Sequence, residues 1–110
     1  MQLFAGCAVA DLAAARAFYE ELLGRGPDLV PNADEACWRL TDEAWLYVIV
    51  DPPRAGGGVL TVLVDDLDAR LADWASRGIV PREVEDYGNG TRKATIIDPA
   101  GNELGFGQVG

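Results

Sequence analysis

The stretch VADLAA at residues 9–14 returns as VDDLDA at residues 64–69, 55 positions later in a chain of 110 residues. Ala17 and Ala72 extend the match. Each copy follows an apolar run and precedes a helix-like pattern that ends at a glycine, Gly24 in the first copy and Gly78 in the second. The same order of strand, cap and helix at half the chain length indicates an internal duplication.

The aspartate in each copy, Asp11 or Asp66, is suited to cap a helix, because a short side-chain oxygen can accept a free N–H group of the first turn. Apolar residues then recur at helical spacing on one face of each predicted helix. In the first helix these are Leu12, Ala15, Tyr19, Leu22 and Leu23, and in the second they are Leu67, Leu71, Trp74 and Ala75.

The rest of each half is typical of strands. The predicted strands span residues 28–31, 36–40 and 44–50 in the first half, and 79–84, 92–97 and 103–108 in the second. Two prolines and three glycines between them predict a linker over residues 52–58. We therefore predict a single α+β domain, residues 1–110, built from two βαβββ modules at residues 1–51 and 59–110.

The segment DPAGN at residues 98–102 has the composition of a tight turn. An aspartate precedes a proline with a fixed φ, and glycine and asparagine follow, which tolerate positive φ. Apolar runs flank the turn at residues 94–97 and 104–106. The segment therefore predicts a hairpin that joins the last two strands.

Composition and charge narrow the function classes. The net charge is −9, with one lysine, Lys93, among nine basic residues, and such a chain repels nucleic acid. No apolar run has the length of a membrane span and the chain does not start with a basic signal sequence, so we expect no membrane contact and a cytoplasmic location. Cys7 and Cys37 lie in apolar runs and are expected to be buried and reduced.

The chain contains no histidine. This excludes Ser-His-Asp and Cys-His catalysis and imidazole general bases, and it removes the commonest ligand of transition metals. Any enzymatic mechanism would have to use carboxylates, Tyr, Cys, Lys or Arg.

The segments VADL (9–12), FYEELLG (18–24), VDDL (64–67) and DPAGN (98–102) together resemble the vicinal oxygen chelate superfamily. That superfamily includes glyoxalase I, extradiol dioxygenases, fosfomycin-resistance proteins and bleomycin-resistance binding proteins. The resemblance implies that the two modules curl around a cleft that holds the ligand.

The resemblance also implies where the metal enzymes of the superfamily take their ligands. Here those positions hold Phe4, Tyr47, Val59 and Gly105, and Glu103 is the one carboxylate close to them. One carboxylate is a poor metal site. We therefore expect no metal, no cofactor and no catalytic residue.

Strand alternation divides each strand into two faces, because successive residues point to opposite sides, and the resemblance implies that the face opposite the helices lines the cleft. The predicted cleft is apolar and aromatic, with Gly105 leaving room for a ligand. It is lined by Phe4, Trp45, Tyr47, Ile49, Val59, Thr61, Leu63 and Gly105, with Trp38, Tyr87 and Glu103 as further candidates. Trp38 could equally lie in the core, Tyr87 falls in a glycine-rich loop at residues 87–90, and the aromatic residues could instead fill a closed core.

A cleft of this kind suits a small planar or aromatic ligand, such as an antibiotic or another secondary metabolite. The acidic chain would favour a cationic ligand. The first prediction is thus a metal-free binding protein. The resemblance implies that βαβββ units pair within or between chains, and from this we predict a homodimer. The alternatives are a divergent isomerase, lyase or dioxygenase-family enzyme that uses Glu103 or Tyr47, and a dimer that binds no ligand.

Overall fold

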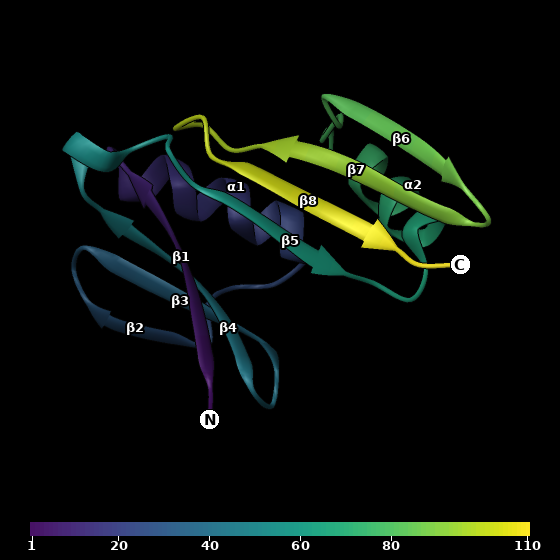
Figure 1. The fold of residues 1–110 in the computed structure, drawn as a ribbon. Helices are drawn as coiled ribbons and strands as arrows, with labels where there is room; N and C mark the ends of the chain where they lie inside the picture. Colours follow the sequence, from purple (N-terminus) through teal and green to yellow (C-terminus); the bar gives the residue numbers. More distant parts are fainter.

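The computed structural model describes residues 1–110 and contains two βαβββ modules of an α+β fold (Figure 1). The elements of the first module are β1 (Leu3–Val9), α1 (Leu12–Leu23), β2 (Leu29–Asn32), β3 (Glu35–Thr41) and β4 (Ala44–Val50). A short 3-10 helix, η1 (Pro52–Arg54), follows. The elements of the second module are β5 (Val59–Leu63), α2 (Leu67–Ser76), β6 (Glu83–Gly88), β7 (Thr91–Ile97) and β8 (Glu103–Gln108). The predicted fold class is confirmed.

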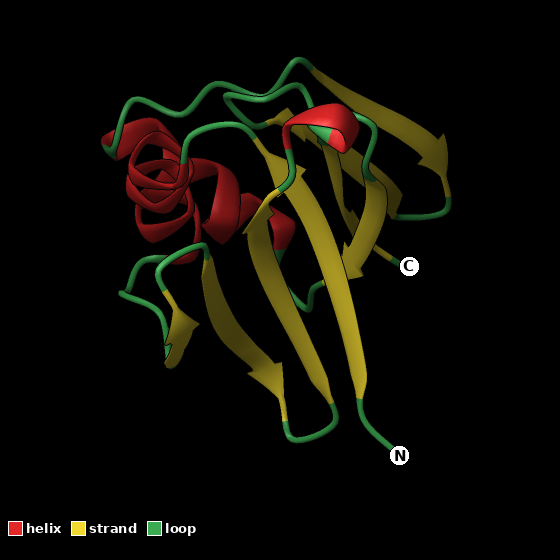
Figure 2. Ribbon diagram, turned by 90° about the vertical axis from the view of Figure 1, so that its left-hand side faces the viewer, coloured by secondary structure: helices red, strands yellow, loops and turns green.

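The two sheets repeat the same topology, as the duplication predicts. The strand orders are β1-β4-β3-β2 and β5-β8-β7-β6. In each sheet the first strand of the module pairs in parallel with the last strand, and the other pairs are antiparallel. Both long helices gather on one side of the two sheets (Figures 1 and 2). Neither helix is long and apolar enough to cross a membrane.

Each helix begins at the predicted cap. The side chain of Asp11 accepts a hydrogen bond from the Ala14 amide at 3.1 Å, and that of Asp66 accepts one from the Ala69 amide at 3.0 Å. Gly24 ends α1 with a φ of +79°, a conformation that favours glycine. Equivalent caps at equivalent positions place both helices at the same point in their modules.

The modules share a single hydrophobic core on the helix-covered side of the sheets. Trp74 of α2 packs edge-on against Phe106, with ring centroids 4.9 Å apart, and its indole N–H donates to the carbonyl of Leu22 in α1 at 2.9 Å. Tyr19 of α1 packs against Trp38 of β3 in the same cluster. The side chains of the two helices therefore hold the modules together.

The DPAGN turn joins β7 to β8 as predicted, and it also ties the modules together. Asp98 and Asn102 are buried. The Asn102 amide group donates to the carbonyl of Ala8 at 2.8 Å and accepts from the Gly58 amide at 2.7 Å. The Tyr19 hydroxyl donates to the Asp98 carboxylate at 2.8 Å, so the turn links α1, β1 and the start of β5.

The predicted strand at residues 79–84 was misplaced, because β6 begins at Glu83. Ile79 follows α2 into the core, where its amide donates to the carbonyl of Trp74. Val80 is 83% exposed, and Pro81 has no N–H to offer a sheet. Ile79 closes the core beneath the helix, Val80 faces solvent, and neither forms a strand.

Candidate ligand-binding site

Each sheet has one face covered by the helices and one face free of them. In the first sheet, the register aligns Phe4 of β1 with Trp45 of β4 and Arg39 of β3 in one cross-strand row. The next row holds Gly6, Tyr47 and Cys37. We call this surface the first helix-free face. It carries Phe4, Trp45 and Tyr47, the aromatic residues that strand alternation places on one side of the sheet.

Phe4 and Trp45 stand side by side on this face as a parallel stack. Their ring centroids are 5.4 Å apart and the ring planes differ by 7°. Phe4 is 47% exposed. The guanidinium of Arg39, on the strand at the other side of β4, lies 5.8 Å from the Trp45 ring centroid, within the range of a cation–π contact. The exposed ring of Phe4 is therefore the accessible aromatic surface of the row.

Tyr47 lies across Gly6. A Cβ atom at position 6 would come within 2.4 Å of the Tyr47 ring, so only glycine allows this approach. The Tyr47 ring is tilted by 58° against Phe4, with centroids 6.4 Å apart. The absence of a side chain on Gly6 thus allows the Tyr47 ring to pack directly against β1, next to the Phe4 ring.

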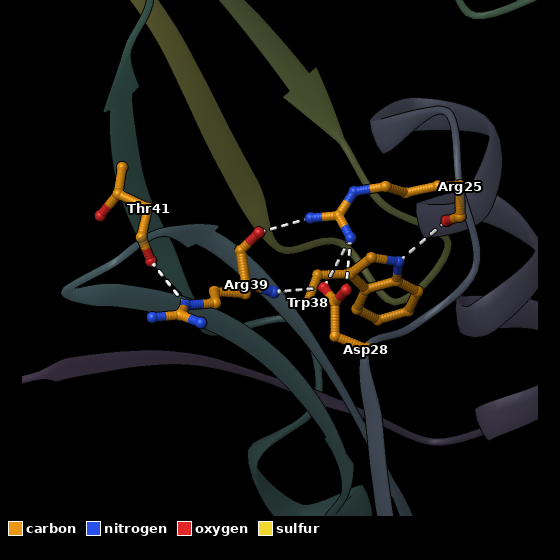
Figure 3. A network of polar contacts seen from close by, with 5 residues as sticks. All are labelled: Arg25, Asp28, Trp38, Arg39 and Thr41. Carbon is orange, nitrogen blue, oxygen red and sulfur yellow. Dashed lines mark hydrogen bonds and ion pairs between the residues drawn. The ribbon is translucent and has the colours of Figure 1, made fainter.

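A polar network fixes the position of Arg39 (Figure 3). Its guanidinium donates to the carbonyls of Thr41 at 3.3 Å and Asp42 at 3.2 Å. The Arg25 guanidinium donates two hydrogen bonds, of 2.6 and 2.7 Å, to the Asp28 carboxylate. It also donates one to the Arg39 carbonyl. The amide of Arg39 and the Arg25 guanidinium lower the pKa of Asp28. Arg39 is therefore held beside Trp45 by contacts that need no ligand.

The indole nitrogen of Trp45 is the one buried side-chain N or O atom without a hydrogen-bond partner. A buried donor left unpaired is costly, and proteins rarely tolerate one without a reason. A ligand acceptor that reached this nitrogen would remove that cost.

The second helix-free face belongs to β5, β8 and β7. Val59 is 77% and Leu63 69% exposed, and Thr61 between them is also exposed. Glu103 forms an ion pair with Arg82 at 2.9 Å. This face is more polar than the first and carries no aromatic stack.

The room expected above Gly105 is already filled. A Cβ atom there would lie 3.0 Å from the Thr61 hydroxyl and 3.2 Å from Cδ of Lys93. The stem of Lys93, from the neighbouring strand β7, covers the glycine. Gly105 therefore makes space for a side chain of the protein itself.

Of the two further predicted site residues, Trp38 lies in the core and Tyr87 lies on the edge strand of the second sheet. Trp38 is fully buried on the helix side, where its indole N–H donates to the Arg25 carbonyl at 3.0 Å, so it belongs to the core. Tyr87, expected in a loop, lies near the end of β6 and is 56% exposed. A hydrogen bond with Glu85 raises the pKa of Tyr87.

The predicted cleft residues form two groups. None of the aromatic contacts or hydrogen bonds joins the first helix-free face to the second. Both faces point away from the helices that unite the modules. A hollow of about 540 Å³ lies beside the first face, lined by Gly6, Ala8, Pro53, Arg54, Ala55, Gly57 and Gly58.

The residues at the ligand positions implied by the superfamily do not fit a metal ion. Phe4, Val59 and Gly105 offer no donor side chain, and Tyr47 offers a phenol. No three His, Cys, Asp or Glu side chains are grouped so that they could hold a metal.

Sequence reasoning missed Cys37 and Lys93 as residues of the helix-free faces. Had Trp38 been assigned to the core, alternation would have placed Cys37 and Arg39 on the opposite face. Nothing in the sequence near Lys93 signals its position over Gly105. Cys7 and Cys37 are buried and free, as predicted, and burial raises the pKa of both thiols.

No family model matches the chain, and no curated protein matches it. Solved structures do. A lactoylglutathione lyase from Agrobacterium tumefaciens is 21% identical, with a TM-score of 0.79 over 98% of this chain and 92% of that one. A bleomycin-binding protein from Streptomyces verticillus, solved with copper(II)-bleomycin, is 22% identical, with a TM-score of 0.76 over 100% and 96%. At these identities the likeness shows the fold.

A crystal structure of a glyoxalase / bleomycin resistance protein from Catenulispora acidiphila is much more similar. It is 44% identical, with a TM-score of 0.97, over 100% of this chain and 99% of that one. Identity at this level along the whole length shows common family membership. The chain belongs to the glyoxalase / bleomycin resistance protein family of the vicinal oxygen chelate superfamily.

Proposed function

We propose that this protein binds a small planar or aromatic molecule on the first helix-free face, without a metal and without chemical turnover. The observation that carries the proposal is the parallel stack of Phe4 and Trp45, with the Phe4 ring exposed beside Tyr47. A flat ligand can extend such a stack by one ring.

Stacking on Phe4 supplies part of the free energy that binding needs, since even millimolar affinity takes about 4 kcal/mol. Removal of apolar surface from water contributes about 25 cal/mol per Å², so burial of roughly 100 Å² contributes about 2.5 kcal/mol. A hydrogen bond to the unpaired Trp45 nitrogen would add to this if the ligand carries an acceptor that can reach it. The thiol of Cys37 on this face donates to the Glu35 carboxylate at 3.9 Å, and burial together with this carboxylate raises the pKa of the thiol, which disfavours its reactive thiolate.

Relatives support the ligand class. The family includes proteins described as bleomycin resistance proteins, and one structural neighbour was solved with copper(II)-bleomycin. We propose an antibiotic or a related secondary metabolite as the ligand. The net charge of −9 favours a ligand with positive charge.

We further propose a homodimer. Large apolar side chains remain exposed on the helix-free side of the molecule, among them Phe4, Val59 and Leu63. A second copy of the chain would cover them and turn open faces into enclosed clefts. A monomeric mass by light scattering would contradict this. The two free cysteines are consistent with the reducing cytoplasm.

The alternative is an enzyme that uses Glu103 or Tyr47. Glu103 is held by Arg82 at 2.9 Å, and Tyr47 lies on the other sheet. Turnover of a substrate that is abolished by Glu103→Gln would favour this alternative over the binding protein.

Calorimetric titration with bleomycin and a panel of planar aromatic cations tests the proposal. We expect saturable binding by the wild-type protein and a loss of about tenfold or more in Phe4→Ala, since one aromatic contact is worth about 1.5 kcal/mol. Val80→Ala is the matched control, because Val80 is exposed but lies on neither helix-free face. Equal affinity in both variants would contradict the proposed site.

A further inference from the structure

Two adjoining hollows of about 190 Å³ each lie where the end of α1 and β3 meet β5 and α2. Leu23, Leu40 and Arg70 line both of them. Of the residues predicted to line the cleft, only Leu63 borders either hollow. Arg39, whose guanidinium lies against Trp45, lines one hollow as well, so the junction adjoins the first helix-free face at Arg39, but neither Phe4 nor Trp45 lines it.

One of these hollows, called the first hollow, is lined mainly by basic side chains. It is lined by Arg25, Arg39, Arg70 and two leucines, and no acidic residue lines it. In a chain with 18 acidic and 9 basic residues, three arginines at one small hollow are a strong local departure from the overall charge.

Arg70 is the arginine without a partner. The other seven arginines each form an ion pair with a carboxylate, whereas the side chain of Arg70 forms no ion pair and no hydrogen bond. Arg25 uses one terminal nitrogen on Asp28 and donates from the other to the Arg39 carbonyl. The Arg70 guanidinium is thus free to receive a ligand, and Arg25 stands at the same hollow with donor capacity left.

The second hollow is mainly apolar. Six of its nine lining residues are hydrophobic, including Val62 of β5 and Phe106 of β8. It meets the basic hollow at Arg70, Leu23 and Leu40. The two hollows together thus present a cationic end and an apolar end to one ligand.

We propose that this junction binds a small amphipathic carboxylate, a molecule with one carboxylate head and a short apolar chain. A planar guanidinium such as that of Arg70 matches the two oxygens of a carboxylate, and Arg25 adds positive charge beside it. The apolar chain lies against Val62 and Phe106. Ligand occupancy would tie α1 and β3 of the first module to β5 and α2 of the second.

Asp65 is the competing carboxylate, since it lines the apolar hollow but forms no ion pair with Arg70. If the proposal holds, Asp65→Asn strengthens binding of the anion by removing a like charge. If Asp65 instead engages Arg70 in solution and blocks it, the wild-type protein will not bind the carboxylate and the proposal is wrong.

The test is calorimetric titration of the full chain with octanoate, and with octanol and acetate as probes that each lack one half of the chemistry. We expect saturable binding of octanoate, and binding of octanol and acetate at least about tenfold weaker. Arg70→Gln should weaken octanoate binding about tenfold. Arg16→Gln, an exposed arginine of α1 away from the hollows, is the control and should bind as the wild type does.

Two results would overturn the proposal. The first is octanoate binding that is unchanged in Arg70→Gln, or matched by octanol. The second is loss of octanoate binding in Phe4→Ala, which would place octanoate on the first helix-free face. The expected result, unchanged octanoate binding in Phe4→Ala, also keeps this test independent of the aromatic site. Circular dichroism of each variant checks that the fold is retained.

Discussion

Asp98 shows how a single buried side chain can organise contacts between distant segments. Its carboxylate accepts four hydrogen bonds, from the Tyr19 hydroxyl, the amides of Ala100 and Asn102, and the side chain of Asn102. No cation contacts it. A buried carboxylate is tolerated when its oxygens are fully hydrogen-bonded, so each donor matters more than an equivalent donor at the surface.

Tyr19→Phe should therefore lower the free energy of unfolding by about 1–3 kcal/mol, because it leaves a buried acceptor short of one donor. Urea denaturation measures the change. Tyr87→Phe is the control, since its hydroxyl is on an exposed side chain, and should cost less than about 0.5 kcal/mol. Equal costs in the two variants would show that the buried bond to Asp98 is not a stabilising one.

At the scale of the element, the duplicated caps make a symmetrical prediction. Asp11→Ala and Asp66→Ala should each lower the free energy of unfolding by about 1 kcal/mol, because each removes one side-chain hydrogen bond to a first-turn amide. Glu21→Ala, at an exposed position inside α1, is the control and should have little effect. Urea denaturation of the three variants is the measurement. A negligible cost at both caps would contradict the role given to the repeat.

Elements with local signals could be predicted from the sequence. The caps, the apolar helix faces and the DPAGN turn each depend on residues within a few positions of one another, and the structure confirms these elements. The strand placed at residues 79–84 failed for a tertiary reason. Ile79 is a β-branched residue of the kind that strands favour, but its side chain is instead buried in the core beneath α2.

At the scale of the whole molecule, the modules are expected to unfold as one unit. The core contains residues from both, and Trp74 of the second module is bonded to Leu22 of the first. Urea unfolding followed by circular dichroism and by tryptophan fluorescence should give coincident transitions. Two separate transitions would show that the modules are energetically independent.

The candidate site shows what the sequence could not supply. Alternation placed Phe4, Trp45 and Tyr47 on one face of their sheet, because a period of two depends on local geometry alone. It could not show that Lys93 lies over Gly105, which depends on the register of β7 against β8. Nor could it show that the helices join the modules so that the two faces point away from the shared core.

The most direct test of ligand binding is tryptophan fluorescence during titration with planar aromatic compounds and, separately, with divalent metal ions. Trp38 and Trp74 are fully buried, so a ligand on the first helix-free face acts on Trp45. We expect saturable quenching by an aromatic compound that disappears in Trp45→Phe. A saturable response to a metal ion alone, or quenching that persists unchanged in Trp45→Phe, would contradict the proposed function.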